Sequence, residues 1–591
     1  MSTRNHTPRN RGFRPETDAL ETRQLLSGVV SGMDSKGDAW TLRLTGPGTI
    51  NVLKQNDASG NPAPLNSATD IRTITFGGTN PQTSRLVGTV VKGANSDGRV
   101  FFQALTQLPA RSEKFPGSGL GLLSISMPNF WLGNTAPVAS TDTPSTHVAS
   151  ISLPDGVETF QFGGVDTTFG SRPPATSTTP DNQDTIIMGL PLYGGTRILI
   201  NQSISSTTIV PATTGTTPTP AHTVQHGVKF IVSGRLDLFQ ANQIVGDSSN
   251  PPGQFTNENT AATGDGGTTV YSAVAGTQPL FPNSLFKGSV TGQIGDVRIG
   301  GNATNFITVV NDATGSGGDR ISNFSIGGET NNVLLVAPNG SRNVVFGKGM
   351  DTVEIRSHVI NNLQANRGAL NSTVYVDRAI SRVQLGGDVV NTKILSGYQQ
   401  SFSGIFSDVT GFNGNNPFAS ITPVAPRIPT NAQIGGGMTV HVAGDVSNSV
   451  FAASVQPYNS TPLTSTPTLV FGDPNQLVLP SGRIRGKIEG KIDNSIATPS
   501  TPTTAFFAQN VQSLAGPVIP PNVPEAPYTG PQTPAHLPGI KVAQAATHAT
   551  TKKSTVKPTK ATALKTSATS QPVTVGSSTP QGPSATTTPN A

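Results

Sequence analysis

The sequence predicts an all-β protein built from a short unit that is repeated and stacked. Three observations support this class. First, the 591 residues include 65 Gly and 48 Pro but only 34% hydrophobic and 12% charged residues, a composition that favours strands and turns over helices. Second, short runs alternate apolar with polar residues, as a strand with one buried face does. Third, in the second half of the chain these runs are followed at a constant distance by Gly and then Asn.

The repeated unit is clearest between residues 286 and 500. A copy has two apolar residues two positions apart, a Gly-containing pair, and Asn four positions after the second member of that pair; the last copy is weaker, with Gly486 at the first apolar position. Five copies place this Gly and Asn at Gly301 and Asn305, Gly328 and Asn332, Gly387 and Asn391, Gly444 and Asn448, and Gly490 and Asn494. Degenerate copies put Thr352 and Asn371 at the Asn position. Successive Asn-like positions from 305 onward are therefore 27, 20, 19, 20, 57 and 46 residues apart.

A nearly constant interval of this size is typical of the coil of a parallel β-helix, or β-solenoid. The apolar pair shares one strand face and is expected inside the stack. The Gly pair is expected to supply positive φ angles, and the Asn to occupy the left-handed region at a corner. Asn recurring at one corner predicts a ladder of side-chain amide hydrogen bonds from coil to coil. The two long intervals predict either weakly marked coils or loop insertions, with residues 411–429 as the best insertion candidate.

Composition and pattern divide the chain into five segments. Ile74-x-Phe76 and Phe160-x-Phe162 repeat the first half of the unit without its Asn, so related β structure is expected in the N-terminal part as well. The segments are a leader-like segment, a β region, a loop-rich β region, the solenoid repeats, and a Pro-, Thr- and Lys-rich tail expected to be disordered, at residues 1–28, 29–170, 171–285, 286–500 and 501–591.

The net charge of +6 belongs to the tail. Glu525 is the last acid, and six Lys follow it, so residues 1–525 hold 33 bases (39 minus 6) and 33 acids. The tail is interpreted as a solvated spacer, with weak binding to an anionic polymer as the alternative. Aromatic residues make up only 6% of the chain and are not interleaved with a basic stripe, which argues against a nucleic-acid partner. No stretch approaches the roughly 20 apolar residues that span a bilayer, so no transmembrane segment is expected.

The N-terminal segment carries a recognisable motif. It contains Phe13-Arg14-Pro15-Glu16 and then Leu20-Glu21-Thr22-Arg23-Gln24-Leu25-Leu26-Ser27-Gly28. This resembles the LEPR-XLL motif at the N-terminus of many large secreted or surface proteins of planctomycete-type bacteria, and it implies export. Thr22 stands where that family usually has Pro or Asp. A short amphipathic helix capping the first domain is the alternative. The matching positions are Arg14, Pro15, Leu20, Glu21, Arg23, Leu25, Leu26 and Ser27.

Catalytic and metal-binding patterns are sparse. Stacked parallel β architectures host pectate lyase-like and polygalacturonase-like enzymes, but glycoside hydrolysis needs two carboxylates held together, and acids such as Asp388 and Asp445 occur singly. A lyase site stays open, because its residues can come from different coils. Asp319 and Asp351 follow Gly-rich fragments that resemble the calcium nonapeptide of repeats-in-toxin proteins. Their spacing of 32 residues, where that family has nine, favours solvated turns. Calcium at Asp319 and Asp351 is the only cofactor considered; no Cys and no paired His occur.

The sequence therefore predicts an exported, extracellular or cell-surface protein of structural or adhesive type that is not an enzyme. Its expected partners are cell-surface or matrix polymers, including polysaccharide. A rigid stack that displays loops would act through many weak contacts. Two alternatives remain: a carbohydrate-active β-helix, either polysaccharide lyase or glycoside hydrolase, and a polysaccharide-binding module without catalysis.

Overall fold

The computed structural model contains only β structure in the residues that it describes. The strands form one sheet of 30 strands and a second sheet of five, and no helix occurs among the described residues. The predicted all-β class is confirmed. The described residues are 28–55, 63–108, 121–133, 149–169, 184–189, 191, 194–210, 222–246, 268–273, 293–310, 321–397, 436–454, 482–493, 505–507 and 510–512.

One coil shows the plan of the stack. β20 (Ser341–Phe346) is followed by a corner, the two-residue strand β21 (Met350–Asp351), a second corner at Thr352, and β22 (Val353–Ser357). The next coil begins at β23 (Ile360–Ala365), which pairs in parallel with β20. Each such coil thus has a first, a second and a third face, and each face stacks on the same face of its neighbours, as a parallel β-helix does.

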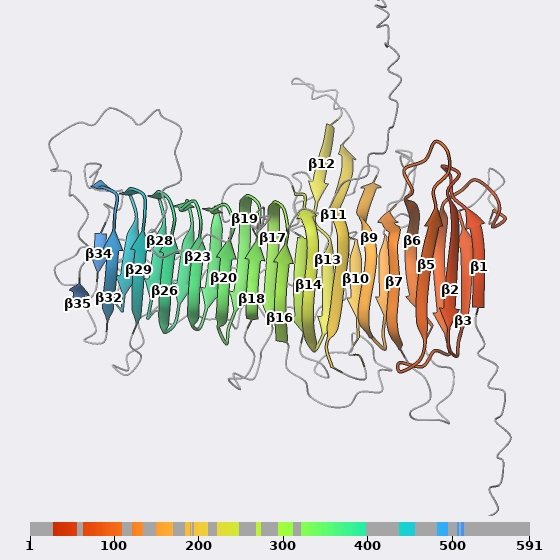
Figure 1. The fold of residues 1–591 in the computed structure, drawn as a ribbon, viewed down its shortest axis with the longest axis horizontal. Coiled ribbons are helices and arrows are strands. Elements are labelled where there is room, and N and C mark those ends of the chain that lie inside the picture. Colours follow the sequence, from red (N-terminus) through yellow and green to blue (C-terminus); the bar gives the residue numbers. More distant parts are fainter. Residues whose placement is uncertain are drawn as a thin grey trace, which may run out of the picture. The chain divides into compact units, whose positions relative to one another are not determined.

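Two parallel strand ladders run through the described residues, from β4 and β5 to β34 and β35. Figure 1 shows them from β5 and β6 onward. The first-face ladder is β5 (Arg85–Val91), β7 (Leu122–Gly133), β9 (Val157–Phe169), β11 (Thr196–Val210), β14 (Arg235–Ile244), β16 (Gln293–Ile299), β18 (Ile321–Ile326), β20, β23, β26 (Ala379–Leu385), β29 (Gly437–Val442), β32 (Arg483–Ile488) and β35 (Asn510–Gln512).

The third-face ladder pairs in the same way. It is β4 (Ile71–Gly77), β6 (Val100–Gln107), β8 (Ser150–Leu153), β10 (Thr185–Met188), β13 (Lys229–Ser233), β15 (Thr268–Ala273), β17 (Ala303–Val310), β19 (Thr330–Ala337), β22, β25 (Thr373–Val376), β28 (Lys393–Ser396), β31 (Val450–Ala453) and β34 (Ala505–Phe507). The small second-face sheet is β21, β24 (Ala369–Leu370), β27 (Val389–Val390), β30 (Val446–Ser447) and β33 (Ile492–Asp493). Both long ladders continue across the expected segment boundaries near residues 170 and 285.

The N-terminal end of the stack changes to antiparallel pairing. β1 (Gly28–Met33) pairs with β2 (Ala39–Thr45), which pairs with β5, and β3 (Thr49–Lys54) pairs with β4. A Cβ on Gly28 would lie 2.8 Å from the side chain of Ile50 on β3, so β1 and β3 pack directly against each other. A hairpin also extends β11, which pairs antiparallel with β12 (His222–His226).

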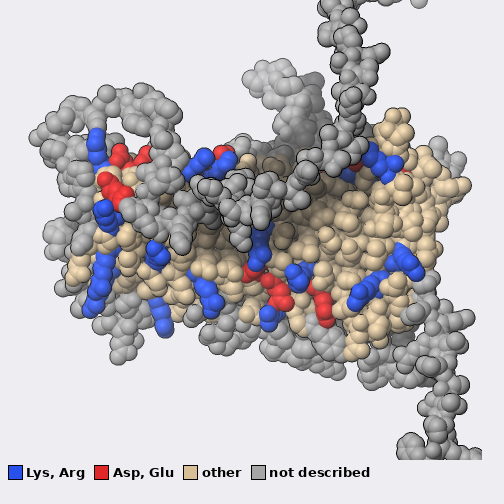
Figure 2. Space-filling view, viewed as in Figure 1, with Lys and Arg blue, Asp and Glu red and all other residues tan. Residues whose placement is uncertain are grey.

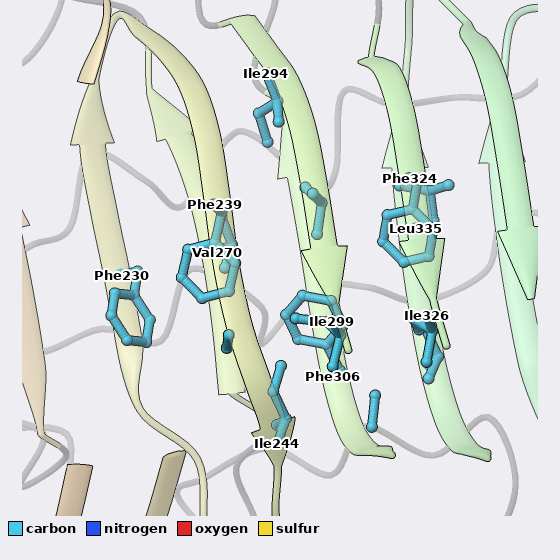
Figure 3. Packing of buried hydrophobic residues seen from close by; sticks show 14 of the residues in the cluster. Phe230, Phe239, Ile244, Val270, Ile294, Ile299, Phe306, Phe324, Ile326 and Leu335 are labelled. Atoms are coloured by element: carbon cyan, nitrogen blue, oxygen red, sulfur yellow. The ribbon is translucent and has the colours of Figure 1, made fainter. Parts of the chain in front are cut away.

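The core is a continuous apolar column between the faces. Both apolar residues of each repeat point inward as expected; Val383 and Leu385, for example, are completely buried. Phe rings stack along part of the column: ring centroids are 6.3 Å apart between Phe239 and Phe306, and 6.2 Å apart between Phe306 and Phe324. Figure 3 shows these rings side by side. This burial supplies the main favourable free energy of the stack, because a single coil has no interior of its own.

The glycines at the first corner have a different purpose from the one that we expected. Gly301, Gly328, Gly387, Gly444 and Gly490 do not have positive φ angles, so that prediction is wrong. They are required because the preceding coil lies too close for a side chain. A Cβ on Gly387 would lie 2.3 Å from the carbonyl oxygen of Arg367, and one on Gly490 would lie 2.2 Å from that of Gly444.

The second corner is the left-handed one. Asn305, Asn332, Asn371, Asn391 and Asn448 have φ between 47° and 56°, as an Asn at this corner tolerates. Their amides form the expected bonds: Asn332 Nδ2 donates to Asn305 Oδ1 at 2.7 Å, Asn391 Nδ2 to Asn371 Oδ1 at 3.1 Å, and Asn448 Nδ2 to Asn391 Oδ1. Asn494 lies outside the described residues.

The long interval between Asn391 and Asn448 contains one coil and an inserted segment. β27 pairs directly with β30, and β28 with β31, so no additional coil lies between them. The interval of 46 residues behaves likewise, because β30 pairs directly with β33. The two segments that separate these strands, 398–435 and 455–481, lie outside the described residues, and the candidate insertion at 411–429 lies within the first.

Thr352 interrupts the Asn ladder, which generates a first prediction. Thr352 has φ 54°, and the buried Oδ1 of Asn332 beside it has no partner in the described residues. Thr352→Asn should add two amide hydrogen bonds and relieve a β-branched residue of a left-handed backbone, raising the free energy of unfolding by about 2 kcal/mol. Chemical denaturation of the full chain measures this. Thr352→Ser, which removes the branch but adds no amide, is the control; equal effects of the two variants would contradict the ladder explanation.

The close approach at the first corner generates a second prediction. Gly387→Ala places a methyl group against the backbone of the preceding coil and should lower the free energy of unfolding by about 3 kcal/mol. Gly349→Ala is the matched control, because its nearest atom would be at 3.4 Å and the expected change is within about 0.5 kcal/mol. Thermal melts of both variants check the difference, and similar melting temperatures would show that the coils can separate freely at this corner.

Candidate functional site

A groove runs along the second face of the stack. Its volume is about 430 Å³. Because the second face is only two residues wide, the side chains of both flanking corners rise beside it. Five successive coils contribute to the lining, with Asn302, Thr304, Glu329, Thr330, Asn331, Lys348, Gly349, Met350, Asp351, Arg367, Gly368, Ala369, Leu370, Asp388 and Val390.

The groove combines mixed charges with an apolar strip. The Glu329 carboxylate and the Lys348 ammonium are 3.1 Å apart, with side chains 65% and 40% exposed, so the pair is open to solvent and contributes little to stability. Arg367 is exposed and has no ion pair within the described part of the chain. Leu370 is 40% exposed and lies beside Val390 of the next coil. Such a surface suits an extended polar ligand with some apolar area.

Acids at the edge of the groove tie one coil to the next. The carboxylate of Asp388 accepts the backbone N–H of Asp445 at 2.8 Å, and that of Asp445 accepts the backbone N–H of Lys491 at 2.7 Å. Asn302 Oδ1 accepts the N–H of Glu329 at 2.9 Å in the same way. The acids that stood singly in the sequence thus recur at one corner, where they bind backbone.

The calcium candidates are separated by the structure. Asp351 lies on β21 in the groove, and its carboxylate accepts the hydroxyl of Thr352 at 3.0 Å. Asp319 lies outside the described residues, as does the N-terminal motif up to Ser27. In the residues that the structure describes, no three His, Asp or Glu side chains are grouped as a metal site would require.

A second polar cluster lies on the outer surface of the third face. β22, β25 and β28 are adjacent strands, and their outward residues form two rows. Glu354, Thr373 and Lys393 are neighbours in one row, and Arg356 and Tyr375 in the other. Arg356 is only 6% exposed, and its guanidinium lies 2.5 Å from the Glu354 carboxylate.

Burial perturbs two groups of this cluster. It raises the pKa of Tyr375 above its usual range, an effect that the charge of Glu354 increases, and it lowers the pKa of Lys393. Perturbed groups that share a surface are candidates for binding or chemistry. Sequence reasoning did not single out these residues. The available signal was their spacing, since 354, 373 and 393 follow the coil period of 19 and 20 residues.

Charge on the visible surface is dispersed. On the face shown in Figure 2, Lys and Arg side chains lie in small separate groups, some beside Asp and Glu and some without an acid next to them. No helix within the described residues is long and apolar enough to cross a membrane.

Comparisons of the chain with protein-family models, with curated proteins and with solved structures give no match.

Asp155, in the turn between β8 and β9, generates a pH prediction. Gln107 Nε2 donates to its carboxylate at 3.0 Å, and burial raises the pKa of Asp155 to about 6. An unfolded Asp titrates near 3.9, so between these two pH values the folded chain binds the proton more tightly. This group should therefore make the free energy of unfolding fall as pH rises through that window. Asp155→Asn should reduce this fall, measured by melts at pH 4 to 7.5; an unchanged pH profile would contradict the assignment.

Proposed function

We propose that the chain is an exported, non-catalytic structural or adhesive protein of the cell surface or extracellular matrix. The observation that carries the proposal is the use of polar side chains along the stack. Amides join Asn305 to Asn332, and carboxylates bind the backbone at Asp388 and Asp445. These bonds make neighbouring coils support one another, which favours a rigid scaffold. Export and surface location are inferred from the resemblance to the LEPR-XLL motif.

The placement of long connections supports a display role. From residue 268 onward, four segments outside the described residues each follow the end of a third-face strand: β15, β17, β28 and β31. They therefore leave the stack at equivalent positions of different coils. Weak contacts made by several such segments would add through avidity, as adhesion to a polymer requires.

The groove favours polysaccharide binding as a second function. It crosses five coils, so a linear polymer could contact the same face of several coils at once. Its mixed charges and the exposed Leu370 suit a polar chain with some apolar area. A carbohydrate-active enzyme, lyase or hydrolase, remains the alternative at the same surface and would require a paired set of acid and base groups there.

The location of the native protein tests the main proposal. Brief protease treatment of intact cells of the source organism should remove the body of the protein, while cytoplasmic enzymes stay intact, and fractionation should recover it with the envelope or the medium. An immunoblot against residues of the stack measures both. Recovery of the protease-protected protein in the cytoplasm would overturn the proposal.

A further inference from the structure

Three hydrogen-bond donors that have no partner among the described residues share the outer surface of the third face. They are the hydroxyls of Thr373 and Tyr375 and the ammonium of Lys393. We propose that they form a binding site for an oxyanion, the carboxylate or sulfate group of an acidic polymer. This site is separate from the groove on the second face, and the inference does not depend on the surface location of the protein.

The strand pattern places the three residues together. Val374, Val376 and Ile394 are completely buried in the core, so Thr373, Tyr375 and Lys393 point outward from β25 and β28. Thr373 and Lys393 are register partners on these adjacent strands, which lie about 4.8 Å apart. Tyr375 is two residues from Thr373 on the same surface. The three donors can therefore reach one bound group.

Each donor is half-buried and lacks a side-chain partner. In the described part of the chain, neither a hydrogen bond nor an ion pair is made by the side chains of Thr373, Tyr375 or Lys393. A cation that is partly removed from water without an anion nearby is unfavourable, and this desolvation is what lowers the pKa of Lys393. A bound oxyanion would restore the lost interaction.

The neighbouring charges do not supply that anion. Glu354 is the nearest acid in the row, but its carboxylate is held by Arg356 at 2.5 Å. The charges of Glu354 and Arg356 cancel. Protonated Lys393 therefore gives the cluster a net charge of one positive unit. The raised pKa of Tyr375 keeps its hydroxyl protonated and able to donate. The cluster therefore offers a cation and two neutral donors, the set that charge-assisted recognition of an oxyanion uses.

The flanking residues limit what else could bind. In the row of Tyr375, the outward neighbours beyond Arg356 and Tyr375 are Val336 and Leu395, and both are buried. The polar patch thus ends on both sides in apolar residues. A second cation or a large uncharged polar ligand would need hydrogen-bond partners beyond the three donors, and none are present. A single charged group on a polymer needs only those three.

The experiment measures binding of the full chain to polygalacturonate, to dextran sulfate and to neutral dextran by calorimetry. We expect the unmodified chain to bind at least one acidic polymer and not neutral dextran. Lys393→Met, which keeps the length of the side chain but removes its charge, should weaken binding at least tenfold, the effect of about 1.4 kcal/mol. Lys393→Arg should retain most of the affinity. The polymer that binds identifies carboxylate or sulfate as the preferred group.

Lys487→Met, on the outer surface of the first-face strand β32, is the matched control and should bind as the unmodified chain does. Lys348→Met reports on binding in the groove. Binding that Lys348→Met weakens but Lys393→Met does not would assign the ligand to the groove and overturn this proposal. Absence of binding to both acidic polymers, or equal affinity for neutral dextran, would also overturn it. Folding gives an independent readout, because removal of an uncompensated half-buried charge should leave the melting temperature of Lys393→Met unchanged or higher. A lower melting temperature would show that Lys393 has an internal partner and contradict the site.

Discussion

Backbone hydrogen bonding between successive coils is the constraint on which the rest of this structure depends. It holds neighbouring strands at about 4.8 Å, so each residue lies beside its counterpart one coil away. Where that counterpart is backbone, as at Gly387, no side chain fits. Where it is an amide, as between Asn305 and Asn332, the two bond. Where it is apolar, as between Val297 and Phe324, the two pack in the core. The repeat in the sequence follows from this self-contact.

The sequence predicted the features that a single strand or corner determines. Alternation put Val383 and Leu385 in the core, and the left-handed corner at Asn391 follows from the conformational preference of Asn. The purpose of Gly387 could not be predicted, because its need arises from a carbonyl of the preceding coil and not from its own φ. The cluster that contains Glu354 and Lys393 could not be predicted from the sequence either. Its members come from different coils and share no residue type, and only the strand register places them on one surface.

Polar side chains in this stack fall into two populations. Side chains of the first population make their hydrogen bonds within the stack, as when the carboxylate of Asp388 accepts the N–H of Asp445. The other has donors with no partner in the described part of the chain, as at Arg367 in the groove and at Thr373 and Lys393 on the third face. Acids of the first kind are held in place by backbone and are less available to a ligand. The second kind defines two surfaces on different faces, so binding at one leaves the other accessible.

The coil at residues 341–357 joins two differently bonded halves. The series of stacked rings that passes through Phe324 ends here at Phe346. Beyond it, buried hydroxyls join the coils: Ser372 accepts the N–H of Val353 at 3.1 Å and donates to the carbonyl of Leu370 at 2.8 Å. Ser449 likewise accepts the N–H of Thr392 at 3.1 Å. Thr352, in this same coil, belongs to neither amide ladder. In a stack where each coil touches only its neighbours, cooperativity passes through every interface in turn. The strand ladders run through this coil unbroken, so local opening is expected to start at the Thr352 corner, where the amide bond to the preceding coil is missing.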